Sequence, residues 1–279
     1  MNPYAAAPAD PLTMVQTCWR NRQLVWQLAK REVVGRYKGS YLGLGWSFFN
    51  PLLMLAVYTL VFGVVFKARW GLAAPGAEES KLMFASVIFA GLIVHSLLAD
   101  VLVRSPGLIL SNANYVTRVV FPLEILPLVA LLSAGFHALV SLVVLVAAVV
   151  ILNGGLPWTV VLLPVVLLPF MLGVLGVSWI LSSLGVYLRD VGQSIGLLVT
   201  LLMFLSPIFY PISAVPQQFR WLLQLNPLTL VIEQVRELLV FGRPLDWLAV
   251  AFYSLGCFAL ACAGFWWFQR TRKGFADVL

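Results

Sequence analysis

Long apolar stretches separated by short polar breaks dominate the hydrophobic pattern of this chain. Six of them approach or exceed the roughly 20 apolar residues that a helix needs to cross a bilayer. The pattern therefore predicts an all-α integral membrane protein with six transmembrane helices in a single domain, residues 40–279. The predicted crossings are residues 43–66, 83–103, 123–152, 157–188, 191–210 and 247–268.

The fourth stretch, 157–188, is longer than a bilayer requires. At 1.5 Å per residue it would reach about 48 Å, against a hydrocarbon core of about 30 Å. We expect this helix to tilt, to kink at Pro164 and Pro169, or to extend beyond the membrane.

The chain before the first crossing divides into two parts. Residues 1–18 begin with small residues and prolines, and they are predicted to form a flexible tail. Residues 19–39 mix apolar and basic positions in a pattern typical of a cytoplasmic helix that lies in the membrane interface, with Gly39 as its end. Its apolar stripe consists of Trp26, Ala29, Val33 and Tyr37.

The segment between the fifth and sixth crossings is apolar but is broken by four prolines. Residues 206–227 read SPIFYPISAVPQQFRWLLQLNP. Irregular backbone at membrane depth must be satisfied by protein or by a water-filled cavity. We therefore predict two short re-entrant helices within residues 207–241 rather than another crossing.

The second of these helices has clear boundaries in the sequence. Asn226 is a good N-cap, Pro227 a good first residue and Gly242 a good stop, which together predict a helix at about 228–241. Within this helix, an ion pair between Glu233 and Arg236 is expected from their i, i+3 spacing.

The composition agrees with a membrane protein. Apolar residues make up 61% of the chain and charged residues 10%, whereas soluble domains are about 45–50% apolar and about 25% charged. These values exclude an ordinary soluble domain, a disordered chain and a coiled coil. The three cysteines, Cys18, Cys257 and Cys262, show neither disulfide nor metal-site spacing.

The distribution of Lys and Arg predicts the orientation. With six crossings, one side of the membrane holds both termini and the loops at 104–122 and 189–190, and it carries twelve of the 18 basic residues. We therefore expect both termini in the cytoplasm and the segment 206–242 at the outer face.

No motif for bond chemistry is present in the sequence. The chain contains no GxxxxGK[ST] phosphate-binding loop, no HExxH or CxxC metal motif and no nucleophile elbow. The sequence therefore predicts a protein that is not an enzyme and that has no cofactor and no metal site.

Three ionisable residues lie within predicted crossings. Asp100 precedes Arg104 by four residues, so an ion pair between them is expected. For His95 and His137, a neutral ring bonded to a neighbouring helix is favoured over a proton relay, because no chain of acidic residues runs through the membrane.

Aromatic residues make up 13% of the chain. Tyr58 and Phe62 are spaced i, i+4 in the first crossing, and Phe209 and Tyr210 lie in the proline-rich segment. Because sugars stack on aromatic faces, these four residues are candidates for the lining of a substrate channel. Packing against lipid or against the protein core is the alternative.

Several polar cytoplasmic pieces are candidates for docking a soluble partner. They are Arg31-Glu32 in the N-terminal helix, the loop from Asn112 to Arg118, and Arg189-Asp190. The alternative is that these charges serve only to orient the chain in the membrane.

Four motifs resemble those of the type 2 ABC exporter permeases for bacterial polysaccharides, namely O-antigen, capsule and wall teichoic acid. RYKGSYLGLGWSFFNPLLMLAVYTLVFGVVF (36–66) resembles the opening signature of that family. YLRDVGQ (187–193), SPIFYP (206–211) and LNPLT (225–229) resemble its later motifs in the expected order. The resemblance extends over nearly the whole chain from about residue 20.

The resemblance implies a homodimer in the bacterial inner membrane that works with two copies of a separate ATPase subunit. It implies an undecaprenyl-diphosphate-linked glycan as substrate, and neither a cofactor nor a nucleic-acid partner. It also implies a headgroup entrance at Arg31, Arg36 and Lys38, and ATPase docking at Arg31, Glu32, Asn112, Asn114, Tyr115 and Arg118. The outer gate would include Pro207, Pro211, Asn226 and Pro227.

The leading hypothesis is therefore a permease subunit for polysaccharide export. O-antigen is the favoured substrate, because the chain has no large outer loop and ends in a short basic tail. The alternatives are an ABC permease for a small lipid or drug, a membrane-embedded glycosyl- or phosphotransferase, and a proton-coupled carrier. A transferase would need clustered carboxylates, whereas Asp100 and Glu124 are isolated in the sequence.

Overall fold

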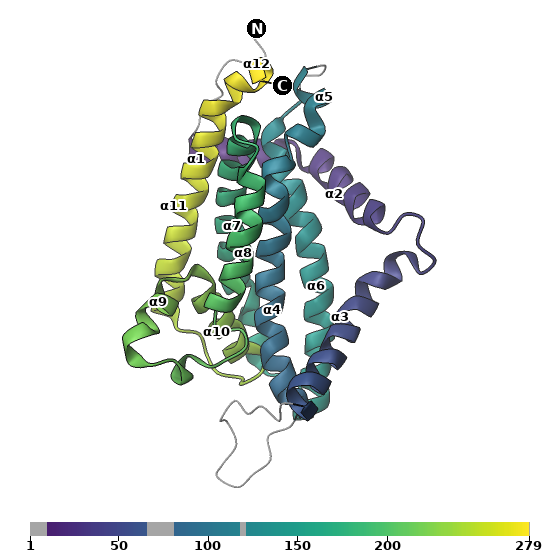
Figure 1. Ribbon diagram of the computed structural model, residues 1–279, viewed down its shortest axis with the longest axis vertical. Helices are drawn as coiled ribbons and strands as arrows, with labels where there is room; N and C mark the ends of the chain where they lie inside the picture. Colours follow the sequence, from purple (N-terminus) through teal and green to yellow (C-terminus); the bar gives the residue numbers. More distant parts are fainter. Residues whose placement is uncertain (1–9, 66–80, 118–120, 279) are drawn as a thin grey trace.

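The computed structural model describes residues 10–65, 81–117 and 121–278, and within these residues the chain is helical and contains no strand (Figure 1). Among the described residues, five helical stretches are long and apolar enough to cross a membrane. They are Gly43–Val65, Lys81–Gly107, Leu123–Asn153, Trp158–Tyr187 and Trp247–Gly274. The shorter apolar helix Val191–Leu205 corresponds to the predicted fifth crossing.

The helices follow one another along the chain with short 3₁₀ turns between several of them. The first crossing combines an α-helix with a π-helical segment, Thr59–Val65. The α-helices are α1 (Pro11–Arg20), α2 (Arg22–Arg36), α3 (Trp46–Tyr58), α4 (Lys81–Arg104), α5 (Ala113–Thr117), α6 (Leu126–Asn153), α7 (Leu163–Tyr187), α8 (Val191–Leu205), α9 (Arg220–Leu225), α10 (Pro227–Leu239), α11 (Trp247–Thr271) and α12 (Phe275–Val278).

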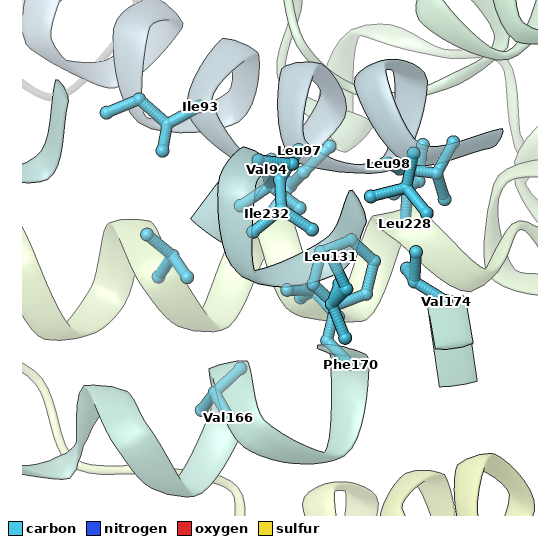
Figure 2. Close-up of a cluster of buried hydrophobic side chains, with 14 of the residues drawn as sticks. Ile93, Val94, Leu97, Leu98, Leu131, Val166, Phe170, Val174, Leu228 and Ile232 are labelled. Atoms are coloured by element: carbon cyan, nitrogen blue, oxygen red, sulfur yellow. The ribbon is translucent and has the colours of Figure 1, made fainter. Parts of the chain in front are cut away.

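Helix α4 forms the centre of the bundle. Of the residues in its most apolar window, 78% are buried, against 17% in the span Gly43–Val65. Figure 2 shows side chains of α4 meeting those of α6, α7 and α10. The labelled residues are Ile93, Val94, Leu97 and Leu98 from α4, Leu131 from α6, Val166, Phe170 and Val174 from α7, and Leu228 and Ile232 from α10.

Helices α7 and α11 approach each other closely because both carry glycine at their contact. A Cβ atom on Gly264 would lie 2.1 Å from the carbonyl oxygen of Gly176, and one on Gly176 would lie 2.8 Å from the Cα of Ala261. Small residues allow such close backbone packing between membrane helices.

Two helix boundaries coincide with sequence signals. Helix α6 ends at Asn153, and Gly154 caps it with a positive φ of 68°. Helix α10 begins at Pro227 after the N-cap Asn226, and Gly242 (φ 64°) follows its end. In both places a glycine adopts the left-handed conformation that other residues avoid.

The fifth apolar stretch is helical over a shorter range than predicted. It was expected over 191–210, but α8 ends at Leu205. Ser206 has an extended backbone with ψ 151°, because the residue before a proline is pushed out of the helical region. In the fourth stretch, Pro164 stands at the start of α7 and Pro169 lies inside it.

The N-terminal region differs from the prediction. Residues 11–18, expected in the flexible tail, form part of α1, in which Met14 and Thr17 are buried. The expected single helix at 19–39 is divided between α1 and α2, with Asn21 at the break.

The buried face of α2 agrees with the predicted stripe at Ala29 and Val33 but differs from it at its start, where Val25 is buried in place of Trp26. Val25 and Ala29 belong to one hydrophobic cluster with Ile125, which immediately precedes α6, and Val129, which lies within α6. Trp26, which was predicted to lie on the apolar stripe, is 67% exposed.

The two ends of the bundle carry different short helices. Helices α5 and α12 lie at one end, and α9 and α10 lie toward the other (Figure 1). The proline-rich segment and the short helices that follow it are thus separated from the C-terminal helix by the length of the bundle.

Candidate functional site

Four charged side chains form a network between α2 and the end of α4. Arg36 donates from Nη2 to both carboxylate oxygens of Asp100, each at 3.0 Å. Arg104 lies with its Nε 3.2 Å from the same carboxylate and also forms an ion pair with Glu32. Two acids and two arginines therefore neutralise one another at this junction.

The predicted pair Asp100–Arg104 is confirmed by this geometry. The participation of Arg36 and Glu32 could not be predicted from local spacing, because they lie 64 residues from Asp100 and 72 residues from Arg104, respectively. All three predicted headgroup cations, Arg31, Arg36 and Lys38, are exposed, and Arg36 is in addition paired with Asp100.

A cavity of about 280 Å³ lies between α3, α4 and α6, next to this network. Its lining includes Arg36, Tyr37, Asp100 and His137. Tyr58, the last residue of α3, also lines it. The Tyr37 hydroxyl lies 3.3 Å from His137 Nδ1. Burial raises the pKa of the Tyr37 phenol, so the phenol keeps its proton at neutral pH.

His95 joins α4 to α8. Its Nε2 lies 3.1 Å from the carbonyl oxygen of Val199, and the side chain is buried. His137 contacts the residue that follows α2. Both histidines therefore contact a neighbouring segment, as the sequence led us to expect.

The four aromatic residues predicted to line a channel lie together. Phe62 lies 6.4 Å from Tyr58 and stacks on Phe209 at 6.0 Å between ring centroids. The Tyr210 hydroxyl donates to the Phe204 carbonyl at 2.9 Å. The cluster thus connects the first crossing to the turn after α8.

Sequence reasoning missed two members of this aromatic cluster. Phe84 lies 6.2 Å from Phe62, and Phe204 lies 6.3 Å from Phe209. Both occur in long apolar stretches, where the residue pattern alone does not distinguish one phenylalanine from another. The ring contacts of Phe84 with Phe62 and of Phe204 with Phe209 identify them in the structure.

Arg236 anchors the turn that follows α8. This side chain is 1% exposed, and it donates to the carbonyls of Val87 (2.9 Å), Pro207 (2.6 Å) and Ile208 (2.8 Å). It also pairs with Glu233 at 3.0 Å, which confirms the predicted i, i+3 contact. One guanidinium therefore links α10, α4 and the backbone of the turn.

Asn226 also connects the start of α10 to the end of α8. Its Oδ1 accepts from the N–H of Leu228, and its Nδ2 donates to the carbonyl of Leu205 and to Ser206 Oγ. Of the other residues predicted for the outer gate, Pro207 is held by Arg236, Pro227 begins α10, and Pro211 precedes the 3₁₀ turn Ile212–Ala214. The structure brings Pro207, Asn226 and Pro227 together at one junction.

The predicted docking residues of the loop after α4 lie near the end of the bundle that carries α12. Asn112 donates from Nδ2 to the Leu108 carbonyl at 2.9 Å, and Tyr115 stacks on Phe121 at 4.4 Å. Asn114 is exposed. Arg118, the remaining predicted docking residue of this loop, lies outside the described residues.

Comparison with known proteins places these features in context. The ABC-2 type transporter family pattern matches residues 23–240. An O-antigen export system permease protein RfbA of Klebsiella pneumoniae is 26% identical over 254 residues, which cover 90% of this chain and 93% of the relative. The protein of the same name from Myxococcus xanthus is 26% identical over 270 residues, covering 96% of this chain and 100% of that relative. Helix α1 lies before the matched region, and α11 and α12 lie after it.

Proposed function

Because this chain belongs to the ABC-2 type transporter family, we propose that it is the permease subunit of an O-antigen exporter. The observation that carries the proposal is the similarity to two O-antigen export permeases over at least 90% of this chain and 93% of each relative. The permease provides the membrane path, and a separate ATPase subunit hydrolyses ATP. The transported species in this proposal is a polysaccharide linked to undecaprenyl diphosphate.

In the proposed topology, the chain crosses the bacterial inner membrane six times and has both termini in the cytoplasm. Helices α3, α4, α6, α7, α8 and α11 are the crossings, and α9 and α10 are re-entrant helices at the outer face. The 15 residues of α8 span only about 22 Å, so the turn held by Arg236 completes the fifth crossing. The excess of basic residues on the side of the termini supports this orientation.

We propose that two copies of the chain assemble with two ATPase subunits. The faces of α3 and α8 that are left uncovered in a single copy are mainly apolar, so that within the membrane either lipid or a second copy can cover them. Exposed members of these faces include Phe48, Leu52, Leu197, Leu201 and Phe204.

The proposed ATPase contacts are α2 and the loop after α4. Arg31 and Asn114 are exposed and available to a partner. Glu32, Asn112 and Tyr115 form contacts within the chain and shape these surfaces, and Arg118 remains part of the proposal. In this proposal, residues 1–18 form an N-terminal extension. Residues 19–39 form the interfacial segment that couples to the ATPase, and residues 40–279 form the transmembrane domain.

The mechanism is a sequence of conformational steps without bond chemistry in this subunit. Closure of the ATPase moves α2, and the network of Arg36, Asp100, Arg104 and Glu32 transmits that movement to α4. The aromatic cluster around Phe62 offers stacking faces along the glycan path. The junction of Pro207, Asn226 and Pro227, together with Pro211 beyond it, forms the outer gate.

A complementation experiment tests the proposal. A strain that lacks this gene and its neighbouring ATPase gene is complemented with each gene alone and with both, and surface glycan and intracellular lipid-linked glycan are measured. We expect surface glycan only with both genes, and accumulated precursor otherwise. If the precursor is never made without this chain, export is the wrong function and a membrane-embedded transferase replaces it.

A further inference from the structure

Three polar groups from three different helices face the cavity between α3, α4 and α6 without a partner. Asn50 on α3 and Ser96 on α4 line it as exposed residues, and in the part of the chain that the structure describes their side chains make no hydrogen bond. The Nε2 atom of His137 on α6 is buried and also has no partner there. All three residues belong to stretches that are apolar enough to cross a membrane.

Their convergence requires a physical explanation. Polar side chains within membrane spans almost always face the bundle interior or a water-filled cavity, and the buried Nε2 of His137 costs free energy unless a polar group bonds it. An amide, a hydroxyl and an imidazole nitrogen that line one open space therefore indicate that the space holds water or a polar ligand. Because they combine donors with acceptors, they suit a ligand with several hydroxyl groups.

The mouth of the cavity carries a group suited to phosphate. The Arg36 guanidinium contacts both oxygens of the Asp100 carboxylate, a geometry that it can also form with two phosphate oxygens. Asp100 is also paired with Arg104 at 3.2 Å. A phosphate could therefore replace Asp100 at Arg36 while the Asp100 charge remains paired.

We propose that this cavity binds the sugar nearest the diphosphate of the lipid carrier, and that Arg36 exchanges Asp100 for a phosphate group when this sugar enters. The assignment rests on the proposed function and names the part of the substrate that this cavity recognises. A volume of about 280 Å³ is just below the usual range for ligand pockets, about 300–1,000 Å³. It therefore accepts one sugar rather than a chain of them.

The test uses the complete transporter, permease with ATPase, in lipid nanodiscs. The probe is a short prenyl diphosphate that carries one hexose, and its affinity is measured by titration. We expect the double variant Asn50→Leu, Ser96→Ala to bind this probe at least tenfold more weakly than the wild type. Ser254→Ala, which removes a hydroxyl from α11 away from the cavity, serves as the matched control and should bind like the wild type.

Further probes separate the two parts of the ligand. The prenyl diphosphate without sugar should bind equally to the wild type and to the Asn50/Ser96 variant, but at least tenfold more weakly to Arg36→Gln. Asp100→Asn should bind both lipid probes severalfold more tightly, because Arg36 loses its competing carboxylate. A soluble hexose 1-phosphate should bind at least tenfold more weakly than the lipid-linked probe, and equal binding would overturn the assignment to the carrier.

The failure of this inference can be distinguished from failure of the proposed function. If the wild-type pair of genes does not restore surface glycan, the proposed function fails. If it does, and the folded Asn50/Ser96 variant binds the sugar-bearing probe like the wild type, only the cavity assignment fails. Thermal unfolding of each variant in the same nanodiscs establishes that it is folded.

Discussion

Arg236 illustrates how one residue can hold several segments in place. Its side chain is almost fully buried, and its three nitrogens reach two carbonyls of the turn after α8, one carbonyl of α4 and the carboxylate of Glu233. Breaking a buried charge contact of this kind costs about 3–5 kcal/mol, because the remaining partners stay desolvated.

We therefore expect Arg236→Met to destabilise the protein by several kcal/mol and to increase proteolysis in the segment 206–226. Arg236→Lys should recover only part of the stability, since one ammonium cannot reach all of these acceptors. The matched control is Arg243→Met, which removes an arginine that is 63% exposed and paired with Glu237, and should change stability by less than about 1 kcal/mol. Equal sensitivity of the two variants to protease would contradict the anchoring role of Arg236.

The sequence predicted residue contacts where the partners are close along the chain. The Asn226 cap, the Glu233–Arg236 pair and the Asp100–Arg104 pair all follow from spacings of four residues or fewer. The contact of Arg236 with Val87 spans 149 residues, and no local pattern encodes it. The candidate cavity likewise depends on three helices whose relative rotation the apolar pattern leaves open.

At the scale of elements, glycine decides how closely α7 and α11 pack. Gly264→Ala would place a methyl group 2.1 Å from the Gly176 carbonyl oxygen, so the helices must separate. We expect a loss of about 1–3 kcal/mol, the usual cost of overpacking, measured as a lower unfolding temperature in detergent. Gly256→Ala on the same helix meets no atom within 4 Å and should be neutral or slightly stabilising. Equal unfolding temperatures for the two variants would show that α7 and α11 are not in close contact.

The element boundaries show which sequence signals were sufficient. Helix boundaries are clear where a glycine or an N-cap marks them: α6 ends at Asn153 before Gly154, and α10 begins at Pro227 after the predicted cap Asn226. Helix α1 was missed because small residues and prolines precede it in the sequence, while its burial of Met14 and Thr17 depends on tertiary contacts. Helix α8 ended early because the apolar stretch continues past Pro207 although the helix cannot.

At the scale of the whole molecule, the number of crossings determines on which side of the membrane the proline-rich segment lies. Between Ser111 and Ser213 the chain runs through α6, α7 and α8. If all three cross, the two serines lie on opposite sides of the membrane. If α8 enters and returns on the same side, they lie on the same side. The short length of α8 makes this the decisive question about the topology.

Cysteine labelling answers it. Both serines are exposed, so Ser111→Cys and Ser213→Cys can be introduced singly after Cys18, Cys257 and Cys262 are replaced. Because the turn after α8 completes the fifth crossing in our proposal, a membrane-impermeant maleimide should label Ser213→Cys in intact spheroplasts. It should label Ser111→Cys only after permeabilisation. Labelling of both positions from the same side would reduce the crossings to five, and labelling of Ser111→Cys alone in intact spheroplasts would reverse the orientation that the basic residues predict.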